Sequence, residues 1–599
     1  MTLLFTLFLS LICLVAASDY HERLELQPLP AGSLLASFNF RSNASQQSFD
    51  QQHFRYFPRS LGQILQHAHT KELHLRFTTG RWDAESWGTR PWNGTREGGT
   101  GVELWAWIDA ANAEDAFAHW ITLTQSLSGL FCASLNFIDS TRTTRPVATF
   151  EPEGDHHASD ADGSLPLHLL HGTLPGEVVC TENLTPFLKL LPCKGKAGIS
   201  SLFDGHKLFD ASWQSMSVDI RPLCPDDGSE CVVQIEQAVD MVLDIDRSKR
   251  PRDNPIPRPV PDDQLLCDTS KPYHSHDTCY PLDKTTDKSW SLTEVFGRSL
   301  NGVCSPAHDA DSSDEEEEGS VCLHVPHERD VFISPGAVEK KNLEETSRCF
   351  TLQPSGTFDL VLSEQDENHH RHSALETPVL SAERTMIGHG QERGGMRIIF
   401  DNPSATDSVD FIYFEALPWF LRPYLHTLQA TVTGHNDRIP RSIPTAQIIK
   451  ESFYRPAIDR QRGTQLELAL SVPPASRVTL TYDFEKAILR YTEYPPDANR
   501  GFNVAPAVIK LAASNNHAYL RTTSLLLPLP TPDFSMPYNV IILTSTVIAL
   551  AFGSIFNLLT RRFVAAEQAE ALGSQTLKGR IGKGLLSLRD RVKRKTKTE

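Results

Sequence analysis

The chain has 599 residues, and its 74 acidic against 57 basic side chains give a formal net charge of −17 at pH 7. A chain of this length exceeds what one hydrophobic core can organise, so two or more domains are expected. An acidic chain also lacks the positive surface that holds a nucleic acid backbone, and no nucleic acid partner is predicted.

The chain opens with the apolar run "MTLLFTLFLSLICLVAA", residues 1–17. This run is short for a membrane span, and the small residues Val15, Ala17 and Ser18 offer a cleavage site, so it is interpreted as a secretory signal peptide. The lack of a basic residue before the apolar run leaves an uncleaved anchor as the alternative. Residues 18–243 are then expected to form a first lumenal domain.

Alternating apolar and polar residues predict strands in this domain, as in "ELHLRFT", where Leu73, Leu75 and Phe77 share one face. One segment, Glu114–Leu130, has the spacing of a helix. The tryptophans of "RWDAESWGTRPWNG", Trp82, Trp87 and Trp92, could stack on sugars or pack in a core; packing is favoured.

Three N-glycosylation sequons fall in this region, at Asn43, Asn93 and Asn183, whereas Asn402 precedes a proline and is excluded. All three lie on the proposed lumenal side, where N-glycans are added. N-glycosylation is therefore predicted at each of them.

Ten cysteines remain after the signal peptide, in a compartment where disulfides persist. Their connectivity cannot be read from spacing. Three local bridges are open possibilities: Cys180 to Cys193, Cys267 to Cys279, and Cys304 to Cys322 across the acidic run "DADSSDEEEEG" at 309–319.

Residues 244–288 are rich in proline and charge and are interpreted as a linker. Residues 289–537 are expected to form a second lumenal domain, with strands in "QLELALSV" and "RVTLTYDF". Frequent prolines and turn residues favour antiparallel β-sandwiches over parallel sheets. The predicted fold class is mainly β, with antiparallel sandwich domains, a few helices and one C-terminal transmembrane helix.

That helix is assigned to residues 538–560, which include twenty consecutive uncharged residues. The tail, residues 561–599, carries eleven Lys or Arg against four Asp or Glu, so it is predicted to be cytosolic and the bulk of the chain lumenal. The ending "KRKTKTE" places Lys595 and Lys597 like a retrieval signal to the endoplasmic reticulum (ER); a basic tail attracted to anionic lipid is the alternative.

A search for catalytic chemistry finds no zinc-protease, phosphate-loop or nucleophile-elbow motif. The histidines of "ENHHRH", His369, His370 and His372, lack the spacing of a closed metal site and are interpreted as a solvated loop, as are Asp155, His156 and His157. No catalytic residue, metal or cofactor is predicted, and structural disulfides are favoured over a catalytic thiol.

Several long strings taken together carry a family resemblance: "YFPRSLGQIL" (56–65), "GLFCASLNFIDST" (129–141), "TLPGEVVCTENLTPFLKLLPCKGKAG" (173–198), "FEALPWFLRPYLHTL" (414–428), "TEYPPDANRGF" (492–502) and "LPTPDFSMPYNV" (529–540). They resemble the PIG-T subunit family of the glycosylphosphatidylinositol (GPI) transamidase along nearly the whole chain. The linker, the acidic run and the basic tail depart from it.

The resemblance implies a non-catalytic subunit of an ER membrane complex that joins proprotein C-termini to a GPI lipid. In that family a separate caspase-like subunit holds the nucleophile, and the cysteine at the position of Cys180 forms a disulfide to it. Two rival functions stay open, a lumenal glycan-processing enzyme with two carboxylates in a cleft and a stand-alone cargo receptor.

Overall fold

The computed structural model describes residues 20–54, 56–156, 165–224, 231–249, 265–267, 279–281, 286–287, 289–304, 319–326, 329–334, 337–341, 347–366, 377–388, 390–435, 439–495, 498, 500–512, 518–531, 535–561, 563–566, 568, 573 and 577–595. The predicted signal peptide, the histidines of "ENHHRH", His157, Lys597 and most of 244–288 and 309–319 lie outside these residues. The chain divides into two units, Met1–Pro530 and Thr531–Glu599.

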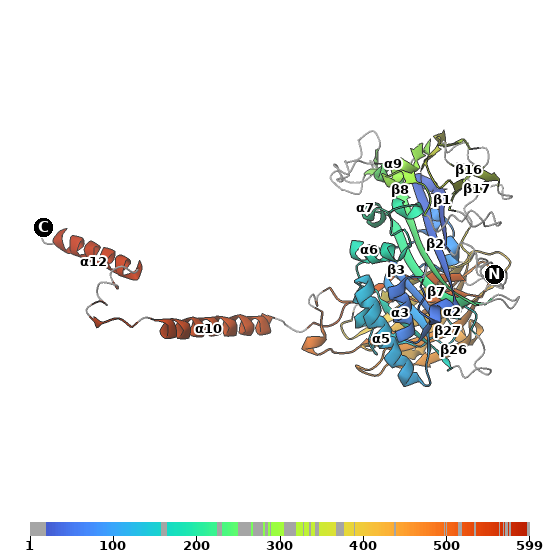
Figure 1. The fold of residues 1–599 in the computed structure, drawn as a ribbon. Helices are drawn as coiled ribbons and strands as arrows, with labels where there is room; N and C mark the ends of the chain where they lie inside the picture. Colours follow the sequence, from blue (N-terminus) through green and yellow to red (C-terminus); the bar gives the residue numbers. More distant parts are fainter. Residues whose placement is uncertain are drawn as a thin grey trace, which may run out of the picture. The chain divides into compact units, whose positions relative to one another are not determined.

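The first unit contains an eleven-stranded sheet with the order β16-β17-β14-β1-β2-β8-β7-β3-β4-β6-β5 (Figure 1). Its strands are β1 (Tyr20–Leu29), β2 (Ser33–Ser45), β3 (Thr70–Gly80), β4 (Gly101–Asp109), β5 (Thr143–Thr144), β6 (Leu167–Leu174), β7 (Trp213–Leu223), β8 (Val232–Asp244), β14 (Ser320–His324), β16 (Ala337–Lys341) and β17 (Ser347–Leu352). Adjacent strands in this sheet run antiparallel, except that β1 and β14 run parallel to each other. The prediction of mainly antiparallel β structure is confirmed.

Helices cover one face of this sheet (Figure 1). They are α2 (Gln46–Asp50), α3 (Arg59–His67), α5 (Ala113–Phe131), α6 (Thr181–Leu190), α7 (Gly205–Phe209) and α9 (Leu292–Phe296). The predicted helix at Glu114–Leu130 is confirmed by α5, which begins where the Asn112 side chain accepts the backbone N–H of Glu114 and Asp115. The helical stripe of α5 buries Trp120 and Leu127 against the sheet, so the second layer of this region is helical.

The other face of β3 carries charged side chains that are also buried, which differs from the predicted half-buried strand. His74 lies between Glu72 (2.7 Å) and Asp219 (2.6 Å), and Arg76 pairs with the same Asp219. Burial opposes the charge on His74, yet Glu153, Asp219 and Glu72 raise its pKa to about 10. Mutual pairing therefore lets charged residues occupy a dry sheet face.

This pairing also corrects the prediction for His156. It was expected in a solvated loop, but its Nε2 lies 2.7 Å from Glu72 Oε2 and its side chain is mostly buried. Asp155 is exposed, as predicted, although it accepts the backbone N–H of Cys224.

A β-sandwich follows, formed by two five-stranded sheets with the orders β21-β22-β28-β24-β25 and β26-β27-β23-β30-β31. Its strands are β21 (Ser381–Ile387), β22 (Arg393–Asn402), β23 (Val409–Leu417), β24 (Leu421–Gly434), β25 (Arg441–Ile443), β26 (Ile449–Arg455), β27 (Thr464–Val472), β28 (Ser476–Lys486), β30 (Val508–Leu511) and β31 (Ala518–Arg521). The predicted strands in "QLELALSV" and "RVTLTYDF" are confirmed as β27 and β28. Their alternate residues, such as Leu468 and Leu480, fill one shared core.

The sandwich packs on the eleven-stranded sheet through a separate cluster of Trp105, Phe150, Phe414 and Tyr519. Beside it, Arg521 Nε donates to Glu103 Oε2 at 2.8 Å, and both side chains are buried. Since Glu103 belongs to β4 and Arg521 to β31, this ion pair joins the two sheets.

Short elements complete the first unit: α4 (Ala84–Trp87), α8 (Ile245–Ser248), β9 (Leu265–Cys267) with β10 (Cys279–Pro281), β11 (Thr286–Asp287) with β20 (Gln365–Asp366), β12 (Trp290–Ser291) and β15 (Val331–Ile333) with β19 (Leu360–Leu362), β13 (Leu300–Asn301) with β18 (Thr357–Phe358), and β29 (Phe502–Val504) with β32 (Leu525–Leu527). Strands β14, β16 and β17 follow the predicted linker in sequence but belong to the eleven-stranded sheet. Division of the chain into domains at 244–288 stays a prediction.

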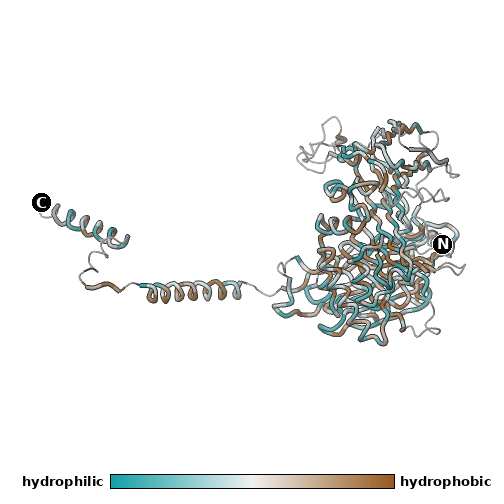
Figure 2. Tube along the Cα trace, viewed as in Figure 1, coloured by the Kyte–Doolittle hydropathy of each residue, from teal (hydrophilic) through white to brown (hydrophobic). Residues whose placement is uncertain are grey.

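The second unit contains α10 (Ser535–Thr560) and α12 (Leu577–Lys595). Within the described residues, one helix is long and apolar enough to cross a membrane, at Tyr538–Thr560. Figure 2 shows brown, hydrophobic residues along α10 and a mixture of teal and brown along α12. The predicted span at 538–560 agrees with this helix.

Candidate functional site

Cys180 lies immediately before α6, at the residue that caps the helix. Its backbone N–H donates to Asn183 Oδ1 (2.9 Å), and its carbonyl accepts the backbone N–H of Asn183 (3.0 Å). These reciprocal bonds hold the cysteine in an extended conformation at the helix start. The Cys180 side chain is half-buried and forms no disulfide in the described part of the chain.

A second unpaired cysteine, Cys132, lies on the adjoining segment. Asn183 Nδ2 donates to the carbonyls of Phe131 (2.9 Å) and Cys132 (3.3 Å), so one side chain joins the end of α5 to the start of α6. Cys132 has φ of 51°, in the left-handed region, and is exposed. Sequence reasoning did not single out Cys132. The number of cysteines was the available signal. If Cys180 bonds outside the chain, nine cysteines remain, so at least one of them is either an unpaired thiol or forms a further external bond.

Two exposed apolar side chains flank these thiols. Val178 is 79% exposed and Phe137 is 61% exposed. The segments that carry them are joined by the Glu177 side chain, which accepts the Ser134 backbone N–H at 2.8 Å. We call Cys132, Phe137, Val178 and Cys180 together the two-thiol surface. This surface therefore presents two unpaired thiols and two exposed apolar side chains on segments that are joined by hydrogen bonds.

The disulfides differ from two of the local bridges considered above. Cys193 bonds to Cys304, and Cys322 bonds to Cys349, so the possible bridges of Cys180 to Cys193 and of Cys304 to Cys322 are both wrong. A further bond joins Cys224 to Cys231. Cys267 and Cys279 face each other in the register of β9 and β10, and their bridge stays a prediction. Cys322 and Cys349 face each other in the register of the antiparallel strands β14 and β17, whereas Cys193 and Cys304 lie outside the strands and are brought together by the packing of distant segments.

A buried carboxyl group lies beside the bond of Cys193 to Cys304, and it predicts an unusual pH dependence of stability. Glu22 Oε1 accepts the Cys304 backbone N–H (3.1 Å), while burial raises the pKa of Glu22 from 4.5 to about 7. The folded state therefore retains this proton longer than the unfolded state. The contribution of Glu22 to the free energy of unfolding is therefore complete below pH 4.5 and is lost as the pH rises through 7. The loss amounts to about 3 kcal/mol.

We expect Glu22→Gln to remove that loss, so that the variant unfolds at a higher temperature than the parent at pH 8 but not at pH 5. Thermal unfolding of the parent and the variant at both pH values measures this difference in unfolding temperature. Glu25→Gln is the matched control on the same strand: although burial opposes the charge on Glu25, His324 and Arg23 lower its pKa, so its contribution is lost toward acid. Identical pH profiles for Glu22→Gln and the parent would contradict the prediction.

The three sequons lie in different environments. Asn93 is exposed, and Asn43 is half-buried with its Oδ1 accepting from Gln234. Asn183 is 2% exposed, and its Nδ2, the atom to which a glycan would be attached, donates to two carbonyls. An enclosed nitrogen has no space for a sugar, so the geometry argues against the predicted glycan on Asn183.

We expect the purified chain to carry N-glycans at Asn43 and Asn93 and an unmodified Asn183. Enzymatic deglycosylation in heavy-oxygen water converts each glycosylated Asn to labelled Asp, and mass spectrometry of the peptides then reads the three positions. Label at Asn183 would mean that the segment before α6 is arranged differently.

The predicted tryptophan packing is confirmed for Trp82 and Trp87. Trp82 is buried, packs edge-on against Trp87 and Trp213 at 5.1 Å, and donates from Nε1 to the Gly88 carbonyl. Trp92 is more exposed and is covered by the Arg96 guanidinium at 3.8 Å.

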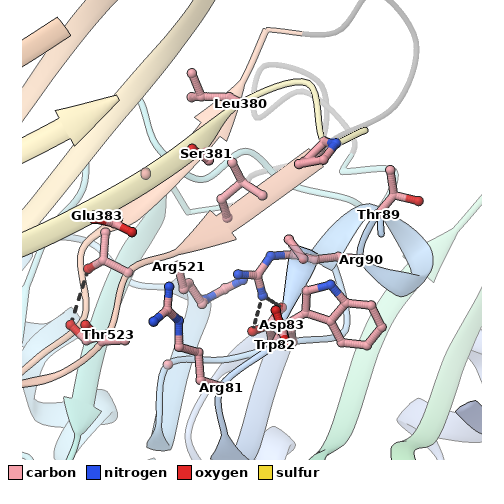
Figure 3. A pocket seen from close by; sticks show the side chains of 18 of the residues that line it. Arg81, Trp82, Asp83, Thr89, Arg90, Leu380, Ser381, Glu383, Arg521 and Thr523 are labelled. Carbon is pink, nitrogen blue, oxygen red and sulfur yellow. Dashed lines mark hydrogen bonds and ion pairs between the residues drawn. The ribbon is translucent and has the colours of Figure 1, made fainter. Parts of the chain in front are cut away.

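A cavity of about 700 Å³ lies between this tryptophan-bearing segment and strands β21 and β31 (Figure 3). Arg81, Arg90 and Arg521 reach into it, and two of them are already neutralised, since Arg90 pairs with Glu97 and Arg521 with Glu103. The described residues that line the cavity include no histidine or cysteine.

A glycosidase site would place a further demand on the cavity. A general acid needs a carboxyl group with a raised pKa. Burial raises the pKa of Glu22 to about 7 and that of Asp240 to about 6, but neither residue lines the cavity. Its Asp83 instead accepts the backbone N–H of Glu85 at the start of α4. Among the described residues no three His, Cys, Asp or Glu side chains are grouped as metal ligands.

At the C-terminus, Lys595 is the last residue of α12. It belongs to the second unit, whereas the two-thiol surface belongs to the first. The retrieval role of Lys595 and Lys597 stays a prediction.

Comparison with known proteins gives one consistent result. The model of the family described as "Gpi16 subunit, GPI transamidase component" matches residues 4–586. The chain is 39% identical to the GPI transamidase component GPI16 of Saccharomyces cerevisiae, over 97% of this chain and 94% of that protein. It is 36% identical to the PIG-T homolog of Schizosaccharomyces pombe, over 94% of each chain, and 33% identical to the human GPI-anchor transamidase component PIGT, over 90% of each chain.

Proposed function

The chain belongs to the family of the Gpi16 subunit, a component of the GPI transamidase, and on this basis we propose that it is a non-catalytic, structural subunit of that complex. As a component, it has other subunits of the transamidase as partners. Its proposed role is to hold and stabilise the caspase-like catalytic subunit while GPI anchors are attached to proprotein C-termini.

The observation that carries this proposal is the unpaired Cys180 at the surface, with Cys193 already bonded to Cys304. The proposed contact is a disulfide from Cys180 to the catalytic subunit. The bonds of Asn183 to Cys180 and to the end of α5 hold the thiol in place. The exposed Phe137 and Val178 would add an apolar contact beside the covalent bond.

The proposed location is the ER membrane, with α10 as a single span, the first unit in the lumen and the tail in the cytosol. The basic tail supports this orientation. The proprotein and the GPI lipid are substrates of the complex, and no cofactor is assigned to this chain.

Two other functions are less well supported. A glycan-processing enzyme needs a pair of suitable carboxyl groups, and one carboxyl group of the cavity, Glu97, is already paired with Arg90. A stand-alone cargo receptor would be purified without stable membrane partners, whereas its relatives are named as transamidase components.

Non-reducing electrophoresis of the complex, purified in mild detergent, tests the proposal. We expect a heavier band that contains both chains and disappears with reductant. Cys180→Ser should abolish that band. Cys132→Ser is the matched control, because Cys132 is also unpaired and lies on the same surface.

Absence of the band in the parent complex, or its persistence in Cys180→Ser, would reject the disulfide. Loss of the band in Cys132→Ser alone would assign the bond to the neighbouring thiol. Purification of the chain without any membrane partner would reject the structural role itself and favour the receptor.

A further inference from the structure

The tail helix α12 has two chemically distinct sides. Ile581, Leu585 and Leu588 follow one another at spacings of four and three residues, so they lie on one face of the helix. All three side chains are more than half exposed. An exposed apolar face of this kind is typical of a surface that a partner or a membrane covers.

Basic residues border this face on both sides. Lys578 and Arg589 lie next to it on one side, and Arg580 and Arg591 on the other. Across α12 as a whole, the sequence has eight Lys or Arg and one acidic residue, Asp590. Long basic side chains at the edges of an apolar stripe can reach lipid phosphates while the stripe enters the acyl region.

The helix is also weak by composition. Gly582 and Gly584 lie inside it, nothing packs against either position, and each glycine costs about 1 kcal/mol relative to alanine. An isolated helix of this length is marginal in water. A surface that takes up the apolar face would supply the missing stabilisation.

The length of the connecting segment limits how far α12 can lie from the end of the candidate membrane span. The candidate span ends at Thr560 and α12 begins at Leu577. The 16 residues between them, 561–576, can extend at most about 55 Å. Such a tether gives α12 a high effective concentration at the bilayer surface.

We propose that α12 is an interfacial membrane helix that lies on an anionic lipid surface, with Ile581, Leu585 and Leu588 inserted at the level of the headgroups. We assign the lipid surface, and not another protein, as the partner that covers the apolar face. The helix is strongly positive, and the short connection to α10 keeps it close to the bilayer. The proposal is independent of the disulfide from Cys180 and needs only that α10 spans the membrane.

Hydrogen exchange of the full chain in its complex tests this proposal. The complex is placed in lipid nanodiscs of phosphatidylcholine alone or with about 30 mol% phosphatidylserine, and we expect exchange of the α12 amides to slow about tenfold with the anionic lipid. High salt should reverse most of this change.

Two variants of α12 separate the effect of its apolar face from that of its polar side. The triple change Ile581→Ser, Leu585→Ser and Leu588→Ser should remove the lipid-dependent protection. Leu586→Ser should retain it, because Leu586 lies on the opposite, polar side of α12. Unchanged protection of α10 would show that both variants are inserted normally.

Equal protection in the two lipid compositions, or protection that survives the triple change, would overturn the proposal and indicate a protein as the covering partner. Equal loss in Leu586→Ser and in the triple variant would also overturn it, because the effect would then reflect helix composition and not the apolar face.

Discussion

Replacing Cys180 by serine is expected to make transamidation by the purified complex strongly dependent on concentration. A covalent tether keeps the partner at an effective concentration in the millimolar range, so even a weak interface stays occupied. If the noncovalent contact has a Kd of about 1 μM, dilution of the untethered complex to about 10 nM leaves about one hundredth of it assembled. We therefore expect about a 100-fold loss of activity at that dilution, and near-normal activity well above 1 μM.

The measurement is transamidation as a function of complex concentration for the parent, Cys180→Ser and Cys132→Ser. The parent and Cys132→Ser should show constant specific activity on dilution. Activity abolished in Cys180→Ser at every concentration would indicate a chemical role for the thiol, because a tether is not a nucleophile. A dilution curve like that of the parent would show that the noncovalent contact suffices.

Breaking the ion pair of Glu103 and Arg521 is expected to destabilise the first unit by about 3–5 kcal/mol. Glu103 accepts from Arg521 (2.8 Å), from the Gly99 backbone N–H (2.7 Å) and lies 3.3 Å from His171 Nε2. Glu103→Gln would leave the Arg521 guanidinium uncompensated between the eleven-stranded sheet and the sandwich. Because Arg521 also reaches into the cavity, the lining of that cavity should loosen with it.

Urea unfolding of the purified chain measures this loss. Asp410→Asn is the control, since Asp410 pairs with Lys450 at the surface and such pairs contribute less than about 1 kcal/mol. The double change of Glu103 and Arg521 to leucine should recover much of the stability, because no charge is then left unpaired. Equal effects of Glu103→Gln and Asp410→Asn would contradict the prediction.

Patterns that depend on neighbouring residues were predictable. Alternation in "QLELALSV" predicted strand β27, helical spacing predicted α5, and an uncharged run predicted the candidate span in α10. The sequence did not predict that polar residues in those strands would be buried. Glu467 alternates with the leucines of β27, yet it is buried and accepts the backbone N–H groups of Val147, Ala148 and Thr149 from more than 300 residues away.

The two-thiol surface shows the same division. The string around Cys180 indicated the importance of that cysteine through the family resemblance. Nothing local indicated that Asn183, read as a glycan acceptor, would instead donate to Phe131 and Cys132 across the end of α5.

The sequence by itself therefore determined the secondary structure periods, the apolar span and the family, because each is written in residues that are close together or in long matched strings. Only the tertiary structure decided which cysteines pair and which polar groups are buried. Cys193 and Cys304 are 111 residues apart in the sequence and meet only because their segments pack together in the folded chain. Disulfide pairing and burial depend on distance in space, and folding sets that distance only when remote segments pack against one another.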